Sequence, residues 1–191
     1  MKRCIILVIL ACVLFVSTGV AEDSEKFVFR NGITWGMSPE EVQECEEALL
    51  FPTEDSKDHY VSPGVYVSKY KAVLTLQFKN EQLFMIVYSF QDDSKQTYEV
   101  IDYLYEALSL KYGDSVNTTF EEVDDVNRFL FGESPLLIPK SRPQGRIYKF
   151  TNVDETDIYL YCNHKLSGAY IMYFNKDLFQ ELHGIYNTDG L

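Results

Sequence analysis

The chain has 191 residues, of which 46% are hydrophobic and 15% aromatic, and its 29 acidic and 17 basic residues give a net charge of −12. This length suits one domain or two small packed halves. Because phosphate binding needs clustered Lys and Arg, the acidic balance disfavours nucleic acid as a partner and leaves solubility or a basic partner as the role of the charge.

The N-terminus has the pattern of a secretory signal peptide over 1–21. Lys2-Arg3 precede an apolar run over 4–16, and small residues from Gly19 to Ala21 follow it. A basic start, an apolar middle and a small-residue exit predict export, with cleavage after Ala21. The protein is then secreted or held in the cell envelope, and it meets a membrane only if this segment is retained or lipidated.

Two other fates of this segment stay open. The apolar run is about as long as the shortest membrane-spanning helices, so it could be retained as an anchor. Cys12 follows Ile9-Leu10-Ala11, which loosely resembles a bacterial lipidation motif, although the chain stays apolar after it. We favour cleavage, which leaves 22–191 as a single α+β domain or as two related halves, 27–113 and 114–191.

The first elements of the mature chain are a short strand, or a strand and turn, over 27–35 and a helix over 39–50. Ser38 can accept the backbone N–H of Glu41, whose carboxylate reaches back to Ser38, and Pro39 fits the first helical position. The apolar stripe of this helix is Val42, Cys45 and Leu49.

A polar loop is expected over 53–58, and strands follow it. Alternating apolar residues predict an antiparallel hairpin over 74–90 and a further strand over 65–71. A second amphipathic helix is expected over 94–112, where Gly113 ends it as a left-handed C′ glycine would.

The second half of the chain begins without strong periodicity. Residues 121–131 predict a short helix, or a strand at 129–131, and three prolines disfavour regular structure over 134–145. Strands are then expected at 146–151, 157–163 and 168–175, with a last short helix at 177–183.

These elements predict an α+β fold, in which an antiparallel β-sheet is covered on one face by the two amphipathic helices. Ile86-Val87-Tyr88 and Ile171-Met172-Tyr173 occupy equivalent places in two hairpins. This match indicates either a repeated hairpin unit or only the composition that strands share.

The run Trp35-Gly36-Met37-Ser38-x-x-Glu41-Val42, with Lys111-Tyr112-Gly113 at the end of the second helix, resembles a group of uncharacterised exported bacterial proteins. The helix start is also similar to that of small outer-membrane-assembly lipoproteins and of the β-lactamase-inhibitor-protein fold. The resemblance implies a non-catalytic protein that binds other proteins through a helix-backed antiparallel sheet.

Residues that could carry chemistry are sparse. Cys45 and Cys162 are the cysteines of the mature chain, and they can pair as a disulfide or stay buried as free thiols. His59, His164 and His183 lie apart from one another, and no hydrolase, phosphate-loop or dinucleotide motif occurs. We therefore expect no metal site, no cofactor and no catalytic residue.

Binding residues are predicted at two places. Tyr159 and Tyr161 point away from Ile158, Leu160 and Cys162, so one face of that strand is aromatic, and such a face either packs in the core or binds a ligand. The apolar tip Leu136-Leu137-Ile138 lies between prolines and forms either a lid over the sheet or a docking loop.

We expect a secreted, non-catalytic binding or inhibitor-like module whose ligand is a protein or peptide; a basic ligand is one reading of the charge, beside solubility. Two alternatives stay open: a secreted hydrolase that acts on glycan or peptide, and an accessory lipoprotein of the envelope.

Overall fold

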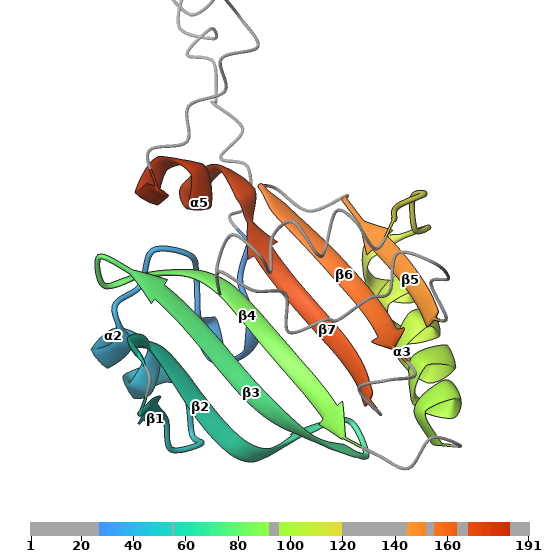
Figure 1. Cartoon of the computed structure of the whole chain (residues 1–191), viewed down its shortest axis with the longest axis horizontal. Coiled ribbons are helices and arrows are strands. Elements are labelled where there is room, and N and C mark those ends of the chain that lie inside the picture. The colour runs from blue at the N-terminus through green and yellow to red at the C-terminus, as the bar shows by residue number, and fades with distance from the viewer. Residues whose placement is uncertain are drawn as a thin grey trace, which may run out of the picture.

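Seven antiparallel strands form one continuous sheet in the computed structural model, which describes residues 27–54, 56–91, 96–119, 145–151, 155–163 and 168–183 (Figure 1). The strands are β1 (Phe51–Thr53), β2 (Ser56–Val67), β3 (Tyr70–Lys79), β4 (Gln82–Gln91), β5 (Gly145–Phe150), β6 (Thr156–Asn163) and β7 (Gly168–Asn175). Their order across the sheet is β1-β2-β3-β4-β7-β6-β5. The predicted α+β class with an antiparallel sheet is confirmed.

The described part of the chain also contains the helices α2 (Pro39–Cys45), α3 (Gln96–Tyr112) and α5 (Lys176–His183), and the 3₁₀ helix η1 (Arg30–Gly32). Helix α2 lies beside the half of the sheet that contains β1 to β3, and α3 lies beside the other half (Figure 1). Helix α3 packs against β5, β6 and β7, whereas α5 packs against β4. Among the described residues, no helix is both long and apolar enough to cross a membrane.

Both faces of the sheet bury apolar side chains. The first cluster joins alternate residues of all the long strands to Val42 of α2 and to Ile101 and Leu104 of α3. The second cluster lies on the opposite face, where Phe179 of α5 contacts Phe84 and Phe174 with ring centroids 5.7 and 5.1 Å apart. The alternation of side chains along β4, β6 and β7 therefore contributes to two separate cores.

The two halves of the sheet meet where β4 pairs with β7. Val87 lies opposite Met172, and this pair is flanked by Ile86 opposite Tyr173 and by Tyr88 opposite Ile171. The two tripeptides that the sequence singled out thus lie side by side, at the centre of the sheet.

The segment before α2 crosses this centre on the face of the first cluster. The ring of Phe29 lies 5.9 Å from that of Tyr88 and 5.1 Å from that of Tyr173. Further along, the N–H of Gly36 donates to the carbonyl of Leu83 at 2.9 Å, and the indole N–H of Trp35 donates to Thr156 Oγ1 at 2.8 Å. These contacts tie the N-terminal segment to both halves of the sheet.

The helix predicted over 39–50 is shorter in the structure. The capping box at Ser38 forms as expected, but α2 ends at Cys45, and Glu46 has extended dihedral angles, with φ −90° and ψ 123°. The carboxylate of Glu46 accepts from Arg30 and from the backbone N–H of Ala48, so its side chain turns inward and the chain leaves the helix. The prediction of a longer helix was wrong because these bonds depend on residues outside the helical pattern.

The polar loop predicted over 53–58 was also wrong in part, because β2 begins at Ser56. The first residues of β2 are polar and show no alternation of apolar side chains. They form a strand because they pair with neighbouring strands; His59, for example, lies opposite Gln77 of β3. The predicted signal peptide, the predicted elements within 121–131 and the irregular stretch over 134–144 lie outside the described residues. Gly145, the last residue of the predicted irregular stretch, is described and begins β5.

We predict that Ile171→Ala lowers the free energy of unfolding by about 2–5 kcal/mol, because it opens a cavity where β4 meets β7. Leu110→Ala removes the same kind of side chain from α3, where Leu110 is 91% exposed, and should change stability by less than about 0.5 kcal/mol. Urea unfolding of both variants measures the difference. Equal losses in the two variants would contradict the central placing of Ile171.

Candidate functional site

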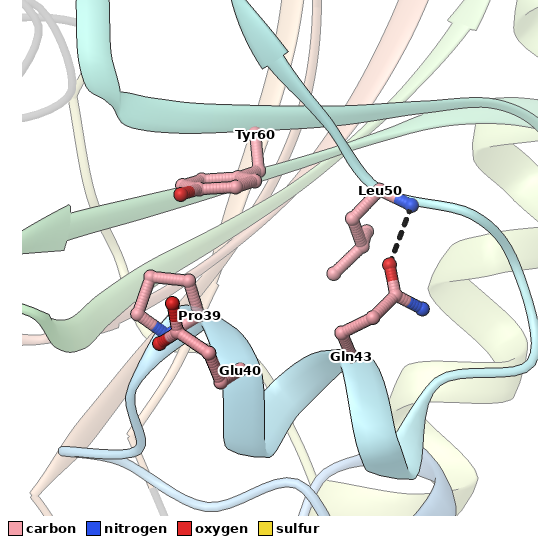
Figure 2. A pocket seen from close by; sticks show the side chains of 5 residues that line it. All are labelled: Pro39, Glu40, Gln43, Leu50 and Tyr60. Atoms are coloured by element: carbon pink, nitrogen blue, oxygen red, sulfur yellow. Dashed lines mark hydrogen bonds between the residues drawn. The ribbon is translucent and has the colours of Figure 1, made fainter.

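A hollow of about 340 Å³ lies between α2 and the first strands of the sheet. Pro39, Glu40 and Gln43 line it from α2, while Leu50 and Tyr60 line it from the segment before β1 and from β2 (Figure 2). Tyr60 is itself supported from within, because its ring packs edge-on against Phe78 with centroids 5.3 Å apart. The volume is at the small end of the range of roughly 300–1,000 Å³ that ligand pockets occupy.

Two large apolar side chains adjoin Leu50, a residue of the hollow, along the chain. Leu49 is 68% exposed and Phe51 is 51% exposed, and they stand on either side of the half-buried Leu50. We name the hollow together with Leu49 and Phe51 the α2–β1 site. Exposed apolar groups next to a concavity are typical of contact surfaces.

Gln43 holds the segment 46–50 from the side of α2. Its Oε1 accepts the backbone N–H of Leu50 at 2.9 Å, which Figure 2 shows as a dashed line. Its Nε2 donates to the carbonyls of Glu46 at 3.2 Å and Ala48 at 3.4 Å. One amide side chain thus satisfies three backbone groups of a segment that has no regular structure.

Glu46 holds the same segment from the other side. Its side chain has no exposed surface, and Oε1 accepts from Arg30 Nη2 at 2.9 Å and from the N–H of Ala48 at 3.2 Å. No described residue donates to its second oxygen, Oε2. Arg30 also donates to the Tyr88 hydroxyl at 3.4 Å, which links the segment to the centre of the sheet.

The tyrosines predicted to bind a ligand lie on the opposite face. Tyr159 and Tyr161 belong to the second cluster, as the alternation against Ile158 and Leu160 predicted, and they are only 3% and 4% exposed. Tyr161 stacks on Tyr170 with centroids 5.1 Å apart. A ligand cannot reach these rings as they stand, so their role in binding stays a prediction. The predicted tip Leu136-Leu137-Ile138 lies outside the described residues.

Cys45 and Cys162 are free thiols in the structure. Cys45 is partly buried beside the first cluster, whereas Cys162 belongs to its buried part. Burial raises the pKa of the Cys162 thiol, which outweighs the opposite effect of Arg146. A buried thiol of this kind packs as a small apolar side chain and is a poor nucleophile.

One cluster of charged groups lies near Tyr159. Lys149 Nζ is 3.0 Å from Asp157 Oδ2, and the Tyr159 hydroxyl donates to the same oxygen at 3.3 Å. Burial alone would lower the pKa of Lys149, but its bonds with Tyr159 and Asp157 together have the larger effect. The net result is a raised pKa, which favours the charged amine. In the described ranges, His, Cys, Asp and Glu form no group of three that could hold a metal ion.

Searches of protein-family models, of curated proteins and of solved structures found no match to this chain. The resemblance carried by the Trp35–Val42 run therefore stays a prediction, and the function rests on the geometry described above.

The α2–β1 site was not predicted from the sequence. Leu49 was assigned to the buried stripe of a longer helix, and neither Leu50 nor Phe51 was selected. The available signal was the apolar run Leu49-Leu50-Phe51 placed between glutamates and Pro52. Its exposure follows from the turn at Glu46, which depends on Arg30, 16 residues away in the chain.

We predict that Gln43→Ala loosens the segment 46–50, because three backbone groups lose their partner. The Leu50 amide should exchange with solvent about tenfold faster, while amides in β3 and β4 keep their rates. Gln43→Glu is a control for the Leu50 bond alone, since its carboxylate still accepts the Leu50 N–H but can donate to neither carbonyl. Hydrogen exchange resolved by residue measures both variants, and unchanged exchange in Gln43→Ala would contradict this role.

Proposed function

We propose that this protein is an exported, non-catalytic binding module that takes up a segment of another polypeptide at the α2–β1 site. The observation that carries the proposal is the exposure of Leu49 and Phe51 on a segment whose backbone is held by Gln43 and Glu46. Here the buried polar bonds hold the segment in place and leave the apolar groups outside.

The energetics of such a surface favour binding. Full burial of one Leu or Phe side chain contributes roughly 1.5–3 kcal/mol, so two of them supply much of the free energy of a specific contact. Because the segment is already ordered, a ligand does not have to fix it, which lowers the entropic cost of association. The hollow between Leu50 and Tyr60 accepts one further side chain of the partner.

The ligand is expected to bind through side chains and not as an added strand. β1 is an edge strand, but it has three residues, and its middle residue is Pro52, which has no N–H to donate. Short edges that contain proline resist pairing with another chain. The binding mode is therefore an apolar contact with a pocket, as in the insertion of side chains into a groove.

We propose further that the fold repeats one helix-and-hairpin unit, with α2 and β2–β4 in the first copy and α3 and β5–β7 in the second. Two cross-strand rows on the face of the first cluster support this. Starting from opposite edges of the sheet, the rows are Tyr60, Leu76, Ile86, Tyr173, Ile158, Phe150 and Tyr148, Leu160, Ile171, Tyr88, Leu74, Ser62. Compared position by position, the first four residues of the two rows are identical in type, and the fifth are Ile158 and Leu74. A two-fold axis that passes between Val87 and Met172 would relate the two rows in this way.

The test of the function is a selection of random peptides from a display library on the wild-type protein. We expect the enriched peptides to lose at least about tenfold in affinity for the double variant Leu49→Ser, Phe51→Ser, because two buried apolar contacts are removed. Leu110→Ser is the matched control, since this leucine is 91% exposed on α3, and its binding should not change. The proposal fails if the double variant keeps the wild-type affinity, or if no peptide is enriched on the wild type.

A further inference from the structure

We propose that the partner segment at the α2–β1 site is cationic, with Lys or Arg next to the large apolar side chain that enters the contact. This inference rests on the proposed function, and it adds the chemical class of the ligand. The charges around the site support it.

The chain segment that carries the site has an acidic rim, by which we mean the exposed Glu40, Glu44 and Glu47; of these three, Glu40 lines the hollow. Residues 31–56 contain seven Asp and Glu residues and no Lys or Arg. Glu41 serves in the capping box and Glu46 pairs with Arg30, so both are occupied by the fold. Glu40 and Glu44 are exposed on α2, and Glu47 is exposed just after it. None of these three forms an ion pair with a described residue.

The spacing of these glutamates makes their charge unfavourable in the free protein. Glu40 and Glu44 are four residues apart on a helix, where like charges repel. Glu40 also lines the hollow, so its carboxylate lies beside the apolar contact (Figure 2). A partner that brings positive charge to this rim relieves the repulsion, whereas an anionic partner adds to it.

The apolar and acidic parts of the site together fit a partner segment in which a cationic residue stands next to a large apolar one. Lys and Arg have long apolar stems, which can lie along Leu50 and Tyr60 while their charged ends reach the carboxylates. A neighbouring Leu or Phe of the partner then enters the hollow. A purely cationic polymer satisfies only the rim, and a purely apolar peptide satisfies only the hollow.

Three short, end-blocked synthetic peptides of equal length test this by titration calorimetry at about 0.15 M salt. The first carries a Leu-Phe pair flanked by lysines, the second the same pair flanked by glutamates, and the third a Ser-Ser pair flanked by lysines. We expect the first peptide to bind the wild-type protein at least about tenfold more tightly than either of the others.

Charge neutralisation on the protein gives the second arm. The triple variant Glu40→Gln, Glu44→Gln, Glu47→Gln should bind the first peptide about tenfold more weakly, because each exposed pair contributes little and three act together. The matched control, Glu99→Gln, Glu106→Gln, Glu181→Gln, changes the net charge equally at exposed positions of α3 and α5 and should bind as the wild type does. Gln keeps the shape of Glu, and a urea unfolding curve checks that each variant is folded.

The outcomes separate this inference from the proposed function. If both triple variants weaken binding equally, the attraction comes from the total charge and the inference is overturned. If the glutamate peptide binds as tightly as the lysine peptide, or if the lysine peptide does not bind, the inference also fails. In these cases the proposed function stands as long as display-selected peptides still depend on Leu49 and Phe51, and it fails only if that dependence is absent.

Discussion

The pairing of β4 with β7 is the constraint on which the rest of the molecule depends. It joins two sets of strands into one sheet, with Val87 and Met172 at the join. A shift of one residue there would turn every side chain of one half to the wrong face, and both faces carry a buried cluster. The register is therefore specified by both faces at once: Ile86 and Ile171 are buried in the first cluster, and Met172 is buried in the second.

With β4 and β7 at the centre, the two edge strands of the sheet are β1 and β5, and their surroundings differ. At one edge, the carbonyl of Lys149 in β5 accepts the N–H of Val116, so part of that edge is covered. At the other edge, β1 is short, and the segment before it is held by side chains of α2. The surface that we propose for binding thus lies beside the edge that β1 forms.

Buried polar groups allow this segment to be ordered without an apolar core of its own. Glu46 and Gln43 satisfy backbone groups that would otherwise need water, and Arg30 compensates the buried charge of Glu46. Removing one partner of such a pair costs more than the pair itself contributes, so the arrangement is held as a unit. Leu49 and Phe51 can then stay exposed in a defined position.

Local patterns allowed much of the fold to be predicted from the sequence. The capping box at Ser38, the hairpin within 74–90, the helix ending at Gly113 and the opposite faces of Ile158 and Tyr159 each depend on neighbours along the chain. These signals are visible in a single sequence because turns, caps and alternation act over a few residues.

The candidate site could not be predicted in the same way. The end of α2 is decided by the bond between Arg30 and Glu46, and the start of β2 by pairing across the sheet. Both are contacts between segments whose proximity is set by the tertiary fold. Periodicity placed Leu49 inside, because a continuing helix would have buried it, and only the turn at Glu46 brings it to the surface.

The proposed function requires the segment that carries Leu49 to be ordered before any ligand arrives. Backbone order parameters from nuclear magnetic resonance relaxation of the free protein test it directly. We predict values of about 0.85 for residues 47–51, equal to those of β3, because Gln43 and Glu46 hold the segment. Values below about 0.6 over these residues, with rigid strands beside them, would contradict the account.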